Sequence, residues 1–213
     1  TGPTREYIDP VRYISNESSG KQGYEIAIAL NKLGIKTTLI TGPSNLVSPK
    51  GIKVKKIISG DEMLNEVKKS LPVDIAVCVA AVSDLKPAEK NKSKIKKENM
   101  NLKSINFIKN NDILEYISKN NKHRPRLVAG FSAETENLAK NSINKIKRKH
   151  CDFIIANDVS KKGIGFNSDY NKVLVIDKNG NIRNIPKNKK SFIANKIAKI
   201  LIDKLLFDDR NIN

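Results

Sequence analysis

The first 23 residues concentrate groups that suit anion binding. They read TGPTREYIDPVRYISNESSGKQG, so hydroxyls, guanidinium groups, glycines and a lysine precede the first stretch of helical periodicity. Residues 15–21 lie at the expected start of a helix, where unpaired N–H groups and the positive end of the dipole attract a phosphate. Ser18 or Ser19 could equally serve only as the helix cap. The segment lacks G-x-x-x-x-G-K-[ST], which argues against a Walker nucleotide loop.

Three further stretches carry candidate binding groups. Residues 80–87 place small side chains at a strand end, where a ligand can approach the backbone, and include Asp84, a candidate ligand for Mg²⁺ or a ribose. Residues 94–97 (KIKK) could neutralise a polyphosphate, and Phe131 could stack on a base. Each also has a purely structural interpretation. Asp84 could be a turn residue before Pro87, residues 94–97 could be a solvated run of charges, and Phe131 could be a core aromatic. Separately, these signals leave both interpretations open.

The elements that must position these residues alternate between strand and helix. Continuous apolar runs predict buried strands, and apolar residues at helical spacing predict the helices between them. The expected strands are 37–41, 54–58, 74–81, 127–131 and 152–156, and the expected helices are 23–33, 61–71, 112–120, 137–149 and 189–205. Residues 172–177 and 181–185 predict a hairpin around a glycine turn. The pattern favours a doubly wound, Rossmann-like α/β fold, with a mostly parallel sheet, helices on both faces and a C-terminal hairpin and helix.

The helix starts and the polar linker also carry expectations. Asp or Asn near the start of 61–71, 112–120 and 137–149 predicts side-chain caps, and Ser191 predicts the cap of the last helix. The segment 86–103 is too polar for a core and too charged for a rigid element, so we expect a mobile loop.

Strand ends define the expected site. In an open α/β sheet, ligands bind outside the carboxyl ends of the strands. Residues 1–20, 42–43, 80–84 and 131–134 would lie at or just after strand ends, so we expect them to meet at one edge. The opening loop should follow a first strand that is barely represented, and the chain starts with Thr1 rather than Met. We therefore expect a single domain, residues 1–213, of a longer polypeptide, lacking most of its first strand.

The net charge of +18 invites a nucleic-acid interpretation, but the distribution of charge argues against it. Thirty-three of the 40 basic residues are lysines spread over every segment, a pattern typical of an AT-rich genome. Aromatic residues make up 5% and tryptophan is absent, which disfavours a stacking platform. A nucleic-acid or acidic-surface binder stays an alternative. So does an NAD(P)-dependent oxidoreductase, although no G-x-G-x-x-G lies near the opening loop.

Cysteine and histidine do not predict a metal site. Cys78 and Cys151 lie in or beside apolar runs, and His123 and His150 stand alone in basic surroundings. Buried thiols and surface histidines fit better than ligands. No apolar stretch is long enough to cross a bilayer and no signal peptide is recognisable, so we expect a cytoplasmic protein.

Taken in order, the motifs resemble a known family. GPTREYIDPVRYISNESSGKQG, TLITGP, AAVSDLKP, KIKK, NNDIL, GFSAET, KIKRKHCD and ANDVS…GFNSD resemble phosphopantothenoylcysteine synthetase over nearly the whole chain. This family forms the second enzymatic half of bacterial bifunctional coenzyme A biosynthesis proteins. The resemblance implies a ligase that joins 4′-phosphopantothenate to L-cysteine through an acyl-cytidylate formed from CTP, with release of pyrophosphate and CMP.

The same resemblance implies cofactors and partners. Mg²⁺ would accompany CTP, and FMN would belong only to an upstream decarboxylase domain. The protein would be a homodimer, or a higher oligomer through that domain, with small-molecule substrates and neither nucleic acid nor membrane as partner. Animal relatives resemble ATP users, so the choice of CTP over ATP rests on the bacterial character of the motifs.

The resemblance also assigns residues. It implies catalytic roles for Asn16 and Lys94, substrate binding by Arg12 and Ala81, and Asp84 as a metal ligand. The implied nucleotide contacts are Cys78, Val79, Ala80, Asp84, Lys94, Asn111, Asp112, Ile113, Leu114, Phe131, Lys145 and Lys149. The sequence departs from the common pattern at Ser83, Leu85, Lys86, Asn111 and Ser132, which bears on affinity rather than reaction type.

Overall fold

A mixed five-stranded sheet forms the centre of the protein. In the computed structural model, which describes residues 1–96, 105–134, 136–158 and 168–210, the strand order is β11-β10-β9-β8-β5. Parallel pairs join β5 (Ile75–Cys78) to β8 (Leu127–Glu134) and β8 to β9 (Phe153–Asp158). The hairpin of β10 (Tyr170–Asp177) and β11 (Ile182–Lys189) then extends the sheet antiparallel to β9.

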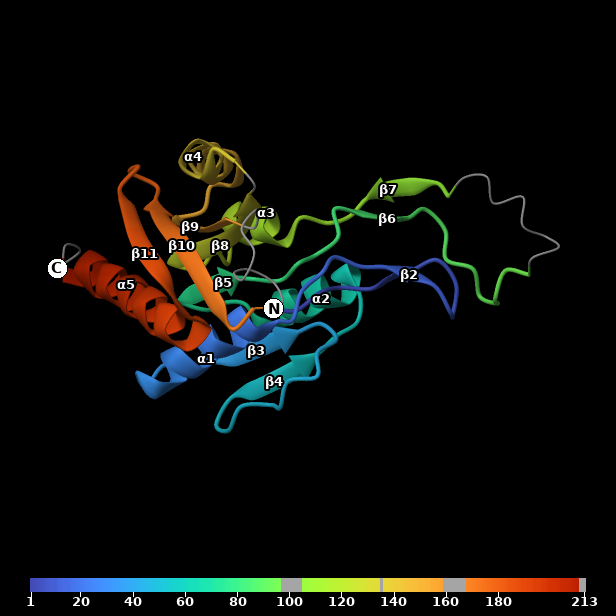
Figure 1. The fold of residues 1–213 in the computed structure, drawn as a ribbon, viewed down its shortest axis with the longest axis horizontal. Coiled ribbons are helices and arrows are strands. Elements are labelled where there is room, and N and C mark those ends of the chain that lie inside the picture. Colours follow the sequence, from blue (N-terminus) through green and yellow to red (C-terminus); the bar gives the residue numbers. More distant parts are fainter. Residues whose placement is uncertain (97–104, 135, 159–167, 211–213) are drawn as a thin grey trace.

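Helices cover both faces of this sheet, as expected for a doubly wound fold (Figure 1). On one face, α1 (Lys21–Lys32) and α5 (Lys190–Arg210) pack on Leu127 and Phe153. On the other, α2 (Gly60–Ser70), α3 (Ile113–Ser118) and α4 (Leu138–Lys149) pack on Val128 and Ile154. Successive strand residues are buried on opposite faces, which explains the continuous apolar runs in the sequence.

A second, two-stranded parallel sheet lies beside the main one. It consists of β3 (Thr38–Thr41) and β4 (Lys53–Lys56), and it contacts α1 and α2. Within the described residues, neither strand pairs with β5, although both sheets lie between the same helix layers. The opening segment links the two sheets at their carboxyl ends. Thr1 is hydrogen-bonded to Ile40 and Gly42 of the β3 side, and Pro3 forms a parallel bridge with Ala81 after β5.

An extended arm projects from this body (Figure 1). Its parts are the antiparallel pair β1 (Glu6–Tyr7) and β2 (Tyr13–Ile14) and the antiparallel pair β6 (Leu85–Pro87) and β7 (Phe107–Lys109). A bond from the Asn91 N–H to the Ile8 carbonyl helps to join the two pairs. The sequence analysis missed these strands, because two or three residues are too few to show an alternating pattern.

Most helix and strand boundaries agree with the sequence predictions to within a few residues, but three caps differ. Helix α2 is capped by Ser59, whose hydroxyl accepts from the Glu62 N–H, and not by Asp61. Ser191 lies inside α5, which starts at Lys190. Asn137 precedes α4 in a left-handed conformation without a side-chain cap bond. Asp112 does cap α3.

The expected loop 86–103 lies partly outside the described residues, because 97–104 are not described. Its first residues belong to β6, so that part of the prediction is wrong: strand pairing with β7 orders Lys86 and Pro87. Among the described residues, no helix is both long enough and apolar enough to pass through a bilayer.

Candidate active site

The opening segment joins the carboxyl ends of β3 and β5. The Gly42 N–H donates to the Thr1 carbonyl at 2.9 Å, and the Ala81 N–H donates to the Gly2 carbonyl at 3.0 Å. Gly42 has no room for a side chain, because a Cβ there would overlap the Pro3 carbonyl oxygen. The opening segment, the loop after β3 and the loop after β5 therefore meet, as expected.

The fourth expected loop is a strand. Residues 131–134 belong to β8, which continues to Glu134 because its last four residues pair with β9 up to Asp158. Phe131 is thus held in the sheet rather than in a turn, with its ring half-buried. Pairing between two apolar strands extends further than the apolar run alone indicates.

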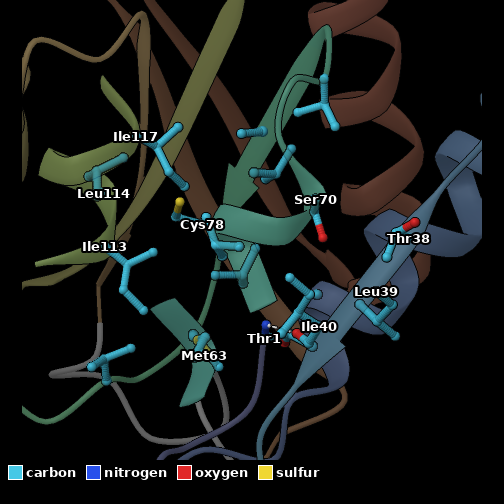
Figure 2. A pocket seen from close by; sticks show the side chains of 18 of the residues that line it. Thr1, Thr38, Leu39, Ile40, Met63, Ser70, Cys78, Ile113, Leu114 and Ile117 are labelled. Atoms are coloured by element: carbon cyan, nitrogen blue, oxygen red, sulfur yellow. Dashed lines mark hydrogen bonds between the residues drawn. The ribbon is translucent and has the colours of Figure 1, made fainter. Parts of the chain in front are cut away.

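A cavity of about 1150 Å³ runs along β3 and β5 and reaches these strand ends. Its wall includes eleven of the residues assigned to nucleotide binding by the family resemblance: Cys78, Val79, Ala80, Asp84, Asn111, Asp112, Ile113, Leu114, Phe131, Lys145 and Lys149. Figure 2 shows Cys78 and the α3 residues facing Thr38–Ile40 of β3, with Thr1 and Met63 between them. Lys36, Lys53, Lys55, Lys69 and Lys109 add further positive charge to the wall.

Lys145 and Lys149 enter this cavity from α4. Lys145 donates to the Phe131 carbonyl at 3.2 Å, and burial lowers its pKa. Lys149 is 8% exposed and donates to Asp112 at 2.5 Å and Glu115 at 2.8 Å. Burial alone would lower the pKa of Lys149, but these two carboxylates raise it overall. Lys149 is therefore a fixed positive charge at the start of α3.

A carboxylate that the sequence analysis did not assign to the site organises its other rim. Asp61 accepts from Lys86 at 2.6 Å and from the Asn111 side-chain amide at 2.9 Å. The Lys86 ammonium holds the pKa of Asp61 below its usual range, despite partial burial. Asp61 thereby orients one predicted nucleotide contact. Only the tertiary fold brings these positions together, so no local motif points to them.

Asn16 lies next to the cavity rather than in its wall. Its side-chain amide donates to the Val82 carbonyl at 3.0 Å, and the neighbouring Ser15 hydroxyl donates to the Thr4 carbonyl at 2.7 Å. The Thr4 hydroxyl in turn accepts from the Ser83 N–H. These bonds fasten the opening loop to the segment after β5, which carries Asp84.

Arg12 and Lys94 are placed on the arm and do not line the cavity. Arg12 donates to Asp9 at 2.5 Å and 3.0 Å, and to the Ile95 carbonyl at 3.3 Å. Asp9 is fully buried and also accepts from the N–H groups of Val11, Arg12 and Ile95. Asp9 therefore joins residues 9–12 (DPVR) to the segment that contains Lys94. The Asp-Pro-x-Arg spacing is the only sequence feature that points to this contact.

Cys151 is buried as the sequence predicted, whereas Cys78 is only partly buried. Burial raises the pKa of the Cys78 thiol to about 12 and that of Cys151 to about 11, so both are neutral thiols. His123 and His150 are exposed. Within the described ranges, no three His, Cys, Asp or Glu side chains gather as metal ligands.

Comparison with known proteins gives one consistent group. The family described as DNA/pantothenate metabolism flavoprotein C-terminal domain matches residues 1–205. The coenzyme A biosynthesis bifunctional protein CoaBC of Borreliella burgdorferi is 42% identical over 93% of this chain, and that of Haemophilus influenzae is 43% identical over 94%. The chain spans about half the length of these curated relatives.

Solved structures have the same architecture. A crystal structure of the C-terminal domain of a CoaBC protein superimposes with a TM-score of 0.80 at 32% identity, covering 97% of this chain and 93% of that one. A Cab2 mutant in complex with phosphopantothenate-cysteine superimposes with a TM-score of 0.76, covering 99% of this chain and 87% of that chain. At 14% identity, the second likeness concerns the fold alone.

Proposed function

This chain belongs to the family of DNA/pantothenate metabolism flavoprotein C-terminal domains, and from that membership we propose that it is a phosphopantothenate–cysteine ligase of coenzyme A biosynthesis. It joins 4′-phosphopantothenate to L-cysteine and forms 4′-phosphopantothenoylcysteine. The observation that carries the proposal is the cavity that reaches the carboxyl ends of β3 and β5, whose wall includes eleven predicted nucleotide contacts, Lys145 and Lys149 among them. The relatives named for coenzyme A biosynthesis support the same pathway.

The proposed chemistry starts from an inert acid. A carboxylate and an amine do not condense in water, so the 4′-phosphopantothenate carboxylate first attacks the α-phosphorus of CTP and pyrophosphate leaves. The amine of cysteine then attacks the carbonyl carbon of the acyl-cytidylate, loses a proton and displaces CMP. Lys145 and Lys149 offset the phosphate charge in the cavity, and Lys94 joins them from the arm.

Magnesium fits this site as a companion of the nucleotide. Mg²⁺ takes one or two protein carboxylates and completes its shell with water and substrate phosphates. Asp84 is an exposed carboxylate in the cavity wall, so it would supply the protein ligand. Bound there, Mg²⁺ would neutralise charge on the departing pyrophosphate.

Asn16 is the proposed donor to the oxyanion that forms when cysteine attacks. Its amide donates to the Val82 carbonyl and would exchange this partner for the developing charge. Removal of one such donor costs about 3 kcal/mol in other enzymes. Arg12 binds the phosphate of phosphopantothenate, and the Ala81 backbone borders the same substrate.

The testing experiment separates the two half-reactions. Asn16→Asp should release pyrophosphate from CTP and phosphopantothenate at the parental rate but form product about 100-fold more slowly. Asn65→Asp, at an exposed position on α2 outside the cavity, is the matched control. Equal loss of both half-reactions would refute the role of Asn16.

A second measurement addresses the nucleotide. Pyrophosphate release is measured with CTP and with ATP, each with and without phosphopantothenate, and we expect release only with CTP and the acid together. Release from neither nucleotide would refute the ligase assignment.

We further propose a cytoplasmic homodimer whose FMN-dependent decarboxylase lies in a separate half of a longer polypeptide. No observation on the described residues favours the dehydrogenase or the nucleic-acid alternative.

A further inference from the structure

Glu6 is a buried carboxylate that the proposed reaction does not use. It lies in β1, is 4% exposed, and is not among the described residues that line the cavity. Its carboxylate accepts from the Gly60 N–H at 2.9 Å. Gly60 is the first residue of α2, and the first N–H groups of a helix have no partner within it. Glu6 therefore caps α2 from a distant part of the chain, with a charge that suits the positive end of the helix dipole.

The start of α2 also has a cap of its own. The Ser59 hydroxyl accepts from the Glu62 N–H at 3.2 Å, and the Glu62 carboxylate accepts from the Ile58 N–H at 2.8 Å, which together form a capping box. The Ile58 carbonyl accepts from the Arg5 N–H at 2.8 Å. Local residues thus suffice to start the helix. The bonds of Arg5 and Glu6 instead fix where the base of the arm lies against α2 (Figure 1).

Asn110, which follows β7, packs against the same point of α2. A Cβ on Gly60 would lie 2.7 Å from the Asn110 Nδ2 and 3.1 Å from the Glu6 Oε1. This Nδ2 atom is buried and has no hydrogen-bond partner among the described residues. The Asn110 Oδ1 accepts from the Asn111 N–H at 2.9 Å, and the Asn110 N–H donates to the Asp84 carbonyl at 2.8 Å. Packing against Gly60 and Glu6 therefore holds the donor end of this amide.

These contacts lead from the arm to the cavity wall. Asp84 is the proposed magnesium ligand, and Asn111 is one of the predicted nucleotide contacts. Asp61, the residue after Gly60, accepts from the Asn111 side-chain amide at 2.9 Å. The first turn of α2 thus contacts β1 through Gly60 and the segment after β7 through Asp61.

We propose that Glu6 is a positioning residue for the nucleotide. It holds the start of α2 against the Asn110 amide, and this arrangement places Asp84 and Asn111 at the cavity wall. The inference rests on the proposed function, which supplies the nucleotide that these two residues contact. Glycine at position 60 serves the same arrangement, because a methyl group there would push Glu6 and Asn110 apart. Glu6 does not line the cavity, so its effect on the nucleotide passes through these neighbours.

Glu6→Ala tests the proposal through pyrophosphate release. The variant leaves the Gly60 N–H without this acceptor and opens space beside Asn110, so the KM for CTP should rise at least about fivefold with a smaller change in kcat. Glu6→Gln keeps an oxygen that accepts from the Gly60 N–H and should hold the KM for CTP within about twofold of the parent. Glu89→Ala, at an exposed position on the same arm, is the matched control and should leave the KM unchanged.

Gly60→Ala perturbs the same contact without touching the carboxylate. Alanine favours a helix more than glycine does, so a change in KM would not come from a weaker α2. We expect the KM for CTP to rise at least about fivefold here too, because the Asn110 amide must move away from Glu6. Parental KM values for CTP in both Glu6→Ala and Gly60→Ala would overturn the proposal. A lower thermal midpoint alone would make Glu6 merely structural.

Hydrogen exchange gives a measurement that needs no substrate. The amides of Asn110 and Asn111 should exchange at least about tenfold faster in Glu6→Ala than in the parent or Glu6→Gln. The Val128 N–H, which donates to Asp152 in the core, is the reference and should not change. Equal exchange at Asn110 and Asn111 in all three chains would overturn the proposal, as would equal acceleration at Val128. Absence of pyrophosphate release by the parent would refute the ligase assignment instead, so the two failures are distinguishable.

Discussion

At the scale of single residues, the site depends on how each charge is held. Lys145 is tied to the Phe131 carbonyl, whereas Lys149 is paired with two carboxylates. Lys145 therefore has the ammonium with fewer competing partners, and it is the better candidate for direct contact with a phosphate. Lys149 acts as a fixed charge that also holds the start of α3.

Lys145→Met tests this distinction. The variant keeps the length of the side chain and loses its charge, so the KM for CTP should rise about tenfold or more, with little change in thermal midpoint. Lys147→Met removes the same charge from an exposed position on the same helix and outside the cavity. The two variants differ only in whether the lost charge faces the cavity. Identical KM values for CTP would contradict a phosphate contact by Lys145.

Asp9 is a positioning residue of the arm. Hydrogen bonds from Arg12 hold its pKa well below the usual range. Asp9→Asn replaces one of the two acceptor oxygens by an NH2 donor. With that donor facing Arg12 and the Ile95 N–H, these two groups lose their common anchor. We expect the KM for phosphopantothenate to rise while the KM for CTP changes less. Asp203→Asn, exposed on α5, is the control. A lower thermal midpoint with both KM values unchanged would make Asp9 merely structural.

At the scale of elements, close approach of the opening segment to β3 is the critical packing feature. Gly42→Ala would drive a methyl group into the Pro3 carbonyl, which is backbone and cannot turn aside. We expect the unfolding free energy to fall by about 1–3 kcal/mol. Activity should fall by a larger fraction than the unfolding free energy does, because Asn16 follows the displaced segment. Ser48→Ala, exposed on the same loop, should change neither quantity. An unchanged thermal midpoint in Gly42→Ala would show that the segment can shift freely.

Elements with a buried face could be predicted from sequence, and elements without one could not. Strands β5, β8 and β9 read as continuous apolar runs because helices cover them on both faces. The arm strands β1, β2, β6 and β7 pair over two or three residues and leave no periodic signal. The same limit applies to the site. The resemblance named its contacts, but the Asp61–Lys86–Asn111 network joins residues 25 and 50 positions apart.

At the scale of the whole molecule, the family assignment made from the motifs is confirmed over residues 1–205.

A net charge of +18 makes the stability of the folded protein dependent on its carboxylates. Glu66 is the clearest case, because it joins Lys55 of β4 and Lys69 of α2 at 2.7 Å and 2.8 Å. It ties the smaller sheet to the helix that lies over it.

Low pH should break the salt bridges of Glu66 with Lys55 and Lys69 over a defined range. Hydrogen bonds from Lys55, the larger contribution, and from Lys69 lower the pKa of Glu66 from 4.5 to about 2. A carboxyl whose pKa is lower in the folded state stabilises fully above its unfolded pKa, and the contribution disappears as pH falls through the folded value. Glu66→Gln should therefore have a lower thermal midpoint than the parent at pH 6, and the difference should shrink between about pH 4.5 and pH 2. Glu89→Gln, at an exposed position on the arm, is the control and should follow the parent throughout. A difference between Glu66→Gln and the parent that stays constant from pH 6 to pH 2 would mean that the two lysines do not hold Glu66 in solution.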